Sequence, residues 1–365
     1  MSAAFLPPYR SPVSVTRVST TRDDADLIAR LGALLATTRT VDGGWATATG
    51  RDADAESTAW VLIGAALVPS LATYRDSAAT WLAAQQRTDG SWSYRRGQEI
   101  ATWPTHAALL ALTLAEGPRV ARSHEARTKA VAWIVQEHSA THTTWQRVVE
   151  WTRERFADRS VPTAEPTVVL DGTLDGFGWA RETFAWVEPT AIAMLAMATQ
   201  PPTHPASQAL RRRLGIGARL LLDRQAPDGG WNYGNKRVLG FDLPGYPDTT
   251  GWALLGLAAA VRAGVIDAPL VFDARARAFA ALARPESPMV SPLPAALAVL
   301  ARSAFGLAND STHAAAKVAS LAPFRAALTS ALNGVRDGYP LLESRSAVLA
   351  LCALHDVDLL VGITR

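Results

Sequence analysis

Acidic side chains stand at the start of four apolar segments, where their number and spacing could support acid–base chemistry. These positions are held by Glu56, which follows Asp54, and by Glu188, Asp248 and Glu343. A carboxyl group in an apolar site keeps its proton more readily, and a nearby carboxylate strengthens this effect. Such a group can act as a general acid. Helix capping is the competing interpretation, although Glu is a weaker cap than Asp or Ser.

Aromatic side chains accompany these acids. They lie at or near the starts of the same kind of segment, as does one histidine: Trp60, Trp103, His106, Trp186, Tyr246, Trp252 and Tyr339. Aromatic faces can line a ligand pocket and attract a cation, but core packing would place rings there as well. Glu188 and Asp248 are the strongest candidates among the acids because Trp186 and Tyr246 lie beside them.

The segments that must position these residues alternate strictly between two kinds. Amphipathic segments lie near 24–38, 76–86, 125–138, 207–225, 270–283 and 312–331. Segments that are apolar nearly all round lie near 56–68, 104–116, 189–199, 249–262, 292–305 and 344–355. Helices of the second kind are buried and those of the first expose one face. Six of each predict an all-α (α/α)6 toroid with an inner and an outer ring, whose inner helices all point the same way.

The predicted toroid forms one domain over 23–365, after an extended arm over 1–22 that is rich in Pro, Ser and Thr. The four acids, with His106 on the second inner helix, are expected to ring one mouth of a central cavity. An insertion near 141–185 breaks the repeat. Because long aromatic insertions are more often functional than inert, we expect it to form a lid or rim.

Composition narrows the class of protein. A net charge of +3 gives no reason to expect nucleic acid as a partner, and the single cysteine, Cys352, rules out an internal disulfide. The first residues lack the apolar run of a signal peptide, and no uncharged apolar run is long enough to span a membrane. The sequence favours a cytoplasmic protein. It leaves open contact with a membrane surface and the oligomeric state.

Three aromatic turns join the predicted outer helices to inner ones. Two follow the pattern Gln-x3-Gly-x-Trp, from Gln86 to Trp92 and from Gln225 to Trp231, and a third, 39–45, lacks the Gln. The glycines permit a tight turn. We expect each Trp to pack on a helix end and each Gln to bond exposed backbone groups, so the turns are structural.

These turns resemble the QW motifs of the terpenoid-cyclase and protein-prenyltransferase superfamily, and 178–191 is similar to bacterial single-barrel prenyltransferase-repeat proteins. The resemblance implies an isoprenoid-handling enzyme, in the first place a class II-type terpene cyclase. Aligned with the Asp-x-Asp-Asp-Thr-Ala motif of such cyclases, Glu56 would donate the proton with Asp54 as its carboxyl partner. Glu188 or Asp248 would assist or take the final proton. The aromatic residues, His106 and Glu343 would contact the isoprenoid, with no redox cofactor.

Two alternatives remain open. One is a non-catalytic barrel that binds a lipid, a peptide or a protein partner. The other is a zinc prenyltransferase-like subunit with an α-solenoid partner, for which only Cys352 and His355 are suitably spaced. We expect no metal site, and Mg²⁺ only through a diphosphate substrate. A cyclase needs a closed apolar cavity with acids at one end, whereas a binding barrel can have a shallow, polar mouth.

Overall fold

The computed structural model describes residues 22–98, 103–115, 121–139, 170–284, 291–306, 311–336, 339–340, 342–361 and 363. The side chains of a few residues within these ranges, among them 311–320 and 339–340, are not described.

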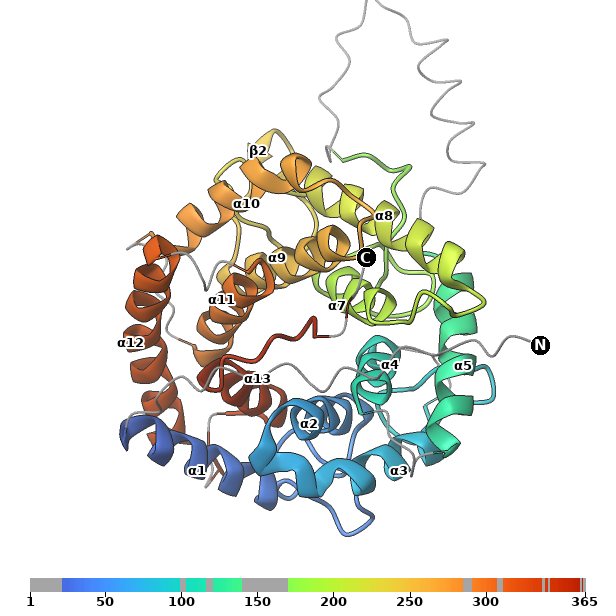
Figure 1. Ribbon diagram of the computed structural model, residues 1–365, viewed down its shortest axis with the longest axis vertical. Helices are drawn as coiled ribbons and strands as arrows, with labels where there is room; N and C mark the ends of the chain where they lie inside the picture. Colours follow the sequence, from blue (N-terminus) through green and yellow to red (C-terminus); the bar gives the residue numbers. More distant parts are fainter. Residues whose placement is uncertain are drawn as a thin grey trace, which may run out of the picture.

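Six helices form a closed inner ring (Figure 1). In order they are α2 (Ala55–Leu67), α4 (Pro104–Leu114), α7 (Val187–Ala198), α9 (Pro247–Arg262), α11 (Pro292–Ala304) and α13 (Ser344–Leu354). Each packs against the next, and α13 packs against α2. In a ring of six, α2 therefore lies opposite α9, and α7 lies opposite α13.

Six further helices surround this ring (Figure 1): α1 (Arg22–Thr37), α3 (Arg75–Gln85), α5 (Ala121–Gln136), α8 (Ser207–Asp223), α10 (Ala268–Leu282) and α12 (Ser311–Asn333). Arg325 of α12 joins the two ends of the outer ring, because it donates hydrogen bonds of 2.6 and 2.7 Å to the two carboxylate oxygens of Asp24 on α1. The predicted all-α (α/α)6 toroid is confirmed, and its helix boundaries lie within a few residues of the expected ones.

The remaining elements are short. A 3₁₀ turn, η1 (Pro69–Tyr74), precedes α3. Two antiparallel hairpins pair β1 (Arg237–Val238) with β2 (Phe241–Asp242) and β3 (Val335–Arg336) with β4 (Tyr339–Pro340). Both hairpins connect an outer helix to the N-terminal end of the next inner helix. They therefore lie at the mouth where the predicted acids begin their helices.

The three aromatic turns use the same set of bonds. The indole N–H of Trp45, Trp92 and Trp231 donates to the carbonyl ten residues earlier, in the last turn of an outer helix, at 2.9, 2.8 and 2.6 Å. The backbone N–H of each Trp donates to a threonine hydroxyl in the first turn of the next inner helix. The bonds satisfy backbone groups that helix ends leave free.

The glutamines fasten these turns to the outer ring. The amide of Gln225 donates to the carbonyls of Gly229 within the turn and Ala274 on α10, both at 2.8 Å. Gln86 does the same with Gly90 and with Ala126 of α5. The middle glycine has a φ between +90° and +95° in all three turns, a conformation that favours glycine. The expected structural role of the turns matches these contacts.

A fourth turn of this type has Phe177 in place of the tryptophan. The Phe177 N–H donates to the Thr190 hydroxyl at 2.9 Å, and these residues are thirteen apart, as are Trp45 and Thr58 or Trp92 and Thr105. The threonines that open the inner helices therefore serve the turns. This explains the similar starts of these helices in the sequence.

The centre of the inner ring is filled by side chains. Apolar residues in the middle of all six inner helices, from 59–65 on α2 to 347–353 on α13, are at most 3% exposed. Residues that lined a cavity able to hold water would have exposed surface. Small residues allow this close packing, and Gly251 is one of them, because a Cβ there would lie 2.6 Å from the Cβ of Leu297.

The change Gly251→Ala is therefore expected to destabilise the protein by about 1–3 kcal/mol through overpacking between α9 and α11. Gly32→Ala is the matched control, since a Cβ at Gly32 on α1 meets nothing within 4 Å. The control should stabilise by about 0.5–1 kcal/mol from helix propensity. Urea unfolding midpoints measure both. Equal effects of the two substitutions would contradict the close approach.

The C-terminal segment closes the end of the ring opposite the mouth (Figure 1). Leu359 and Leu360 are each 1% exposed and belong to the core. Asp358 pairs with Arg262 at the end of α9, and Asp356 accepts a 2.7 Å hydrogen bond from Ser303 on α11. Among the described residues, polar groups near the axis are therefore offered to a ligand at the mouth, where the inner helices begin.

Candidate functional site

A buried arginine occupies the mouth of the ring. The Nη1 atom of Arg345 lies 2.8 Å from Glu56 Oε1 and 2.7 Å from Glu188 Oε1. The exposed fractions of the three side chains are 14%, 15% and 9%. Each of these residues is the second of its helix, on α13, α2 and α7. The helix starts thus bring two of the predicted acids together around a cation that the sequence analysis did not consider.

Two contacts cross the axis at this point. The Arg345–Glu188 pair joins α13 to α7, which lie on opposite sides of the ring. The rings of Trp60 on α2 and Trp252 on α9 lie with their centroids 5.5 Å apart, and these helices are also opposite one another. The guanidinium lies 5.7 Å from the Trp252 ring centroid. An ion pair and two indoles together close the axis.

The pKa values of Glu188 and Arg345 are shifted by burial and by their neighbours' charges. Burial raises the pKa of Glu188, and the carboxylates of Glu56 and Asp248 raise it further, against the opposing charge of Arg345. Burial acts to lower the pKa of Arg345, but Glu188 and Glu56 outweigh burial and raise it. Arg345 is therefore a permanent cation, and Glu188 is the mouth acid best suited to hold a proton.

Asp54 caps a helix and takes no part in the ion pairs that Arg345 makes with Glu56 and Glu188 at the mouth. Its carboxylate caps α2, accepting from the Ser57 N–H at 2.7 Å and the Ser57 hydroxyl at 2.9 Å. It also accepts from the backbone N–H and hydroxyl of Thr47, at 3.0 and 2.8 Å. Burial raises the pKa of Asp54, and these bonds oppose the rise. Asp54 thus follows the capping interpretation, and Glu56 is paired with Arg345 instead.

Aromatic side chains surround the acids on two sides of the mouth. Trp103 stacks on Tyr94 with a centroid distance of 5.6 Å and meets Trp179 edge-on at 5.2 Å. Tyr246 contacts Tyr233 at 5.4 Å. Both tyrosines are more than 40% exposed. The exposed rings are available to a ligand, whereas Trp60 and Trp252 are fully buried.

The other predicted site residues lie nearby or outside the described side chains. Trp186 is half-buried and caps α7. Asp248 is half-buried in the first turn of α9, close enough to raise the pKa of Glu188. Glu343 is exposed at the start of α13, and its charge acts on Arg345. The side chain of Tyr339 is outside the described part.

His106 does not join the ring of acids, and this expectation is corrected. It is 2% exposed and contacts Phe177 at 4.8 Å and Trp133 of the outer helix α5 at 6.1 Å, measured between ring centroids. Burial, aided by Arg213, lowers the pKa of His106 to about 3, so it is neutral. The apolar environment between the two rings explains this orientation.

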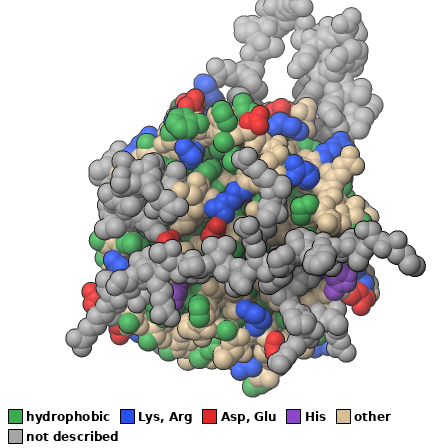
Figure 2. Space-filling model, viewed as in Figure 1, with side chains coloured by type: hydrophobic (Ala, Val, Ile, Leu, Met, Phe, Trp, Pro, Cys, Tyr) green, Lys and Arg blue, Asp and Glu red, His purple; other side chains and the backbone are tan. Residues whose placement is uncertain are grey.

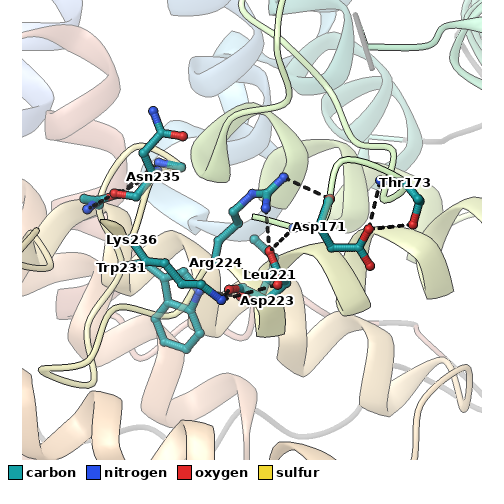
Figure 3. Close-up of polar contacts among 10 residues, drawn as sticks. Asp171, Thr173, Leu221, Asp223, Arg224, Trp231, Asn235 and Lys236 are labelled. Atoms are coloured by element: carbon teal, nitrogen blue, oxygen red, sulfur yellow. Dashed lines mark hydrogen bonds and ion pairs between the residues drawn. The ribbon is translucent and has the colours of Figure 1, made fainter. Parts of the chain in front are cut away.

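The described part of the predicted insertion contacts the mouth through Trp179, whose ring meets that of Trp103; 140–169 lie outside the described residues. Figure 3 shows the polar contacts between this part of the insertion and the C-terminal end of α8. Asp223 accepts from the Asp171 N–H at 3.2 Å and from the Lys236 ammonium at 3.3 Å, and it pairs with Arg224. One carboxylate thus ties the insertion to the segment before the β1–β2 hairpin.

A surface hollow of about 460 Å³ lies away from the mouth, beside α3 and the first aromatic turn. Its lining includes Asp42, Asp76, Trp81 and Arg96. It does not contain any predicted site residue.

On the face seen in Figure 2, Lys and Arg side chains are interspersed with acidic and apolar ones.

Metal ligands do not gather in the described residues, where no three His, Cys, Asp or Glu side chains are placed to hold an ion. Burial raises the pKa of Cys352 to about 12, so this thiol stays protonated. Burial also lowers the pKa of His355.

None of the helices in the described ranges has the length and apolar character needed to cross a bilayer.

Arg345 is a residue of the candidate site that was not predicted from the sequence. A signal was present, because a cation in the first turn of a helix opposes the helix dipole. A lone arginine at the start of an apolar inner helix therefore needs carboxylate partners, and three inner helices carry one at the same position.

Comparisons with solved structures show the fold. A GH76A alpha-1,6-mannanase from Salegentibacter aligns with a TM-score of 0.61 at 9% identity, covering 91% of this chain and 98% of that one. The type II terpene cyclase MstE from Scytonema aligns with a TM-score of 0.53 at 14% identity, covering 91% and 97%. A variant of this cyclase, also with a TM-score of 0.53, contains its substrate, geranylgeranyl dihydroxybenzoate.

No protein-family model matches the chain, and no curated protein sequence does. The chain is thus an (α/α)6 toroid of the kind found in terpene cyclases and in a mannanase. The alignment covers nearly the whole of that cyclase chain.

Proposed function

We propose that this chain is an isoprenoid-handling enzyme, a class II-type cyclase that protonates its substrate from Glu188. The observation that carries the proposal is the state of Glu188, a buried carboxyl whose pKa is raised and which reaches the axis beneath the mouth. The shared fold with a type II terpene cyclase that holds a geranylgeranyl substrate supports it.

Glu188 is a better donor than the motif residues. Asp54 accepts four hydrogen bonds as a cap, which leaves its carboxylate no free role beside Glu56. Glu56 is paired with Arg345 and adds negative charge near Glu188. In this arrangement Glu56 raises the pKa of Glu188, because two close carboxylates do not both ionise cheaply, while Arg345 opposes the rise.

The reaction is an isomerisation. The Glu188 proton adds to one alkene carbon, the π bond becomes the new C–H bond, and the neighbouring carbon becomes a tertiary cation. A second alkene attacks this cation and closes a ring. Loss of a proton to Asp248 or to the Glu188 carboxylate forms the product alkene, and a proton passed from Asp248 or solvent restores the acid. Because the substrate gains one proton and later loses one, the reaction requires no redox cofactor. Mg²⁺ would bind only together with a diphosphate substrate.

A substrate can reach Glu188 only if the axis opens. The tyrosines at the mouth offer exposed aromatic surface for an approaching isoprenoid. The reacting end must then separate Arg345 from Glu188. Removal of the guanidinium raises the pKa of Glu188 further, so entry of an apolar chain also favours the protonated form of this residue.

The test is incubation with farnesyl and geranylgeranyl diphosphates and squalene, followed by mass spectrometry. Glu188→Gln is expected to lower product formation by about 100-fold or more, the usual effect of losing a general acid. Glu125→Gln, at an exposed position on the outer helix α5, is the matched control and should keep most of the activity. Equal activity of wild type and Glu188→Gln would contradict this assignment, and loss in Glu56→Gln alone would return the role to Glu56. Incubation with alpha-1,6-mannotriose, which a variant of the mannanase with this fold binds, tests for mannanase activity instead.

A second candidate is a non-catalytic barrel that binds a partner at its mouth. The filled centre of the inner ring favours it, because the described inner helices leave no deep cavity open to a polyprenyl chain. In that case, calorimetry would detect binding of an isoprenoid, peptide or lipid, and mass spectrometry would recover the ligand unchanged. Conversion of any isoprenoid to a cyclic product would exclude it.

A further inference from the structure

The Arg345 guanidinium is held as a bound organic cation would be held. Its contacts come from three helices other than its own: Glu56 on α2, Glu188 on α7 and the ring of Trp252 on α9. Carboxylates and an aromatic ring are the groups that proteins use to bind ammonium and guanidinium ligands.

The carboxylate side of this site is incompletely satisfied. Glu188 is 7% exposed, and within the described residues its Oε1 atom accepts no hydrogen bond of good geometry, although Arg345 Nη1 lies 2.7 Å away. Buried polar atoms nearly always have hydrogen-bond partners. A cation whose N–H groups point directly at this oxygen would satisfy it better than Arg345 does.

We propose that Glu56, Glu188 and Trp252 form an organic-cation site and that Arg345 is its built-in occupant, displaced by ligands carrying a guanidinium or ammonium group on an apolar chain. The charge of the mouth fixes the sign of the ligand. Asp248 and Glu343 add to the two carboxylates, and Arg345 is the cation whose charge they share. The site therefore disfavours carboxylate and phosphate head groups. It does not depend on Glu188 acting as an acid.

The ligand's apolar chain follows from the neighbours of the site. Beneath the guanidinium lie Trp252 and Trp60, and the exposed rings of Tyr233 and Tyr246 lie at the mouth. A small inorganic cation would leave these surfaces unused. An alkyl ammonium or alkyl guanidinium can place its charge between the carboxylates and its chain against the rings.

The first test is chemical rescue. Calorimetry and thermal unfolding of Arg345→Ala are measured with methylguanidinium chloride, using sodium chloride at the same ionic strength as a control. The variant is expected to bind methylguanidinium and to unfold at a higher temperature in its presence, whereas wild type is not stabilised by this short cation. Glu188→Gln/Arg345→Ala should bind about tenfold more weakly or worse, because it lacks one charge-assisted bond. Binding that is absent, or equal in both variants, overturns the cation site.

The second test uses wild type, so it does not depend on the folding of a variant. Hexylguanidinium is expected to bind wild type with displacement of Arg345, whereas hexanoate and hexanol should not. Equal binding of hexylguanidinium and hexanol, or none by hexylguanidinium, overturns displacement of Arg345 by a ligand. Neither result depends on turnover of an isoprenoid, so failure of the cation site and failure of the cyclase proposal are distinguishable.

Discussion

Replacing Trp231 with alanine is expected to destabilise the protein by about 3–5 kcal/mol, the usual range for a fully buried tryptophan. Trp231 is 0% exposed, and its indole donates a 2.6 Å hydrogen bond to the Leu221 carbonyl near the end of α8. Its backbone N–H binds the Thr250 hydroxyl on α9. The change opens a cavity at the junction of both rings, and urea unfolding measures the loss.

Two controls separate the parts of this effect. Trp231→Phe keeps most of the volume but loses the indole donor, leaving the Leu221 carbonyl without its partner, so about 1–3 kcal/mol is expected. Tyr233→Ala removes an aromatic ring two residues away that is 49% exposed, and it should cost less than about 1 kcal/mol. If Trp231→Ala and Tyr233→Ala lowered the unfolding free energy equally, the structural role of the turn would be disproved.

The architecture was predictable because it depends on local patterns. Helices that are apolar all round alternate with amphipathic ones, and the hydrophobic effect alone sorts them into two rings. The turn from Gln225 to Trp231 carries its own bonding groups, so its position between α8 and α9 follows from the sequence. The fourth turn escaped notice because Phe177 keeps the backbone bond to Thr190 but lacks the indole donor.

The candidate site was predictable only in part, because its geometry depends on contacts across the ring. Sequence periodicity indicated that Glu56 and Glu188 start inner helices at one mouth. It could not show that the ring is narrow enough for side chains to meet across it, and so it did not pair Glu188 with Arg345. His106 shows the same limit, since a helix that is apolar on every side gives no sign of which face points inward.

The filled axis also depends on these long-range contacts. Trp60 and Trp252 were predicted to line a cavity, yet they meet across it because α2 and α9 lie opposite each other at short range. The distance across the ring is set by many small residues on several helices at once, such as Gly251 against Leu297. No single segment of the sequence contains that information.

Replacing Arg345 with methionine is expected to destabilise the protein by about 3–5 kcal/mol near neutral pH, the usual loss when one member of a buried ion pair is removed. Methionine approximates the length of the arginine stem and fills its space. The loss then comes from charge, because the buried Glu188 and the partly buried Glu56 remain without the guanidinium between them. Urea unfolding at pH 7.5 measures the difference from wild type.

The loss should shrink as the pH falls, and the sign follows from Glu188. Its pKa in the folded protein is already raised by burial, Glu56 and Asp248, and the variant lacks the opposing effect of Arg345. The folded state therefore holds a proton that the unfolded chain, with an ordinary pKa of about 4.3, releases. Stability rises as the pH falls through the folded pKa of Glu188 towards this value. Measurements at pH 7.5 and 5.5 should show a smaller gap from wild type at pH 5.5.

The variant Glu188→Gln/Arg345→Met is the matched control for charge. It removes both members of the cross-axis pair and leaves Glu56 as the one carboxylate of the original trio, so it should recover much of the stability and lose most of the pH dependence. If the single and double variants were equally unstable, packing of the arginine stem would be the cause. If Arg345→Met matched wild type at pH 7.5, the carboxylates would have to be neutral there already, and Glu188 would keep its proton even without Arg345.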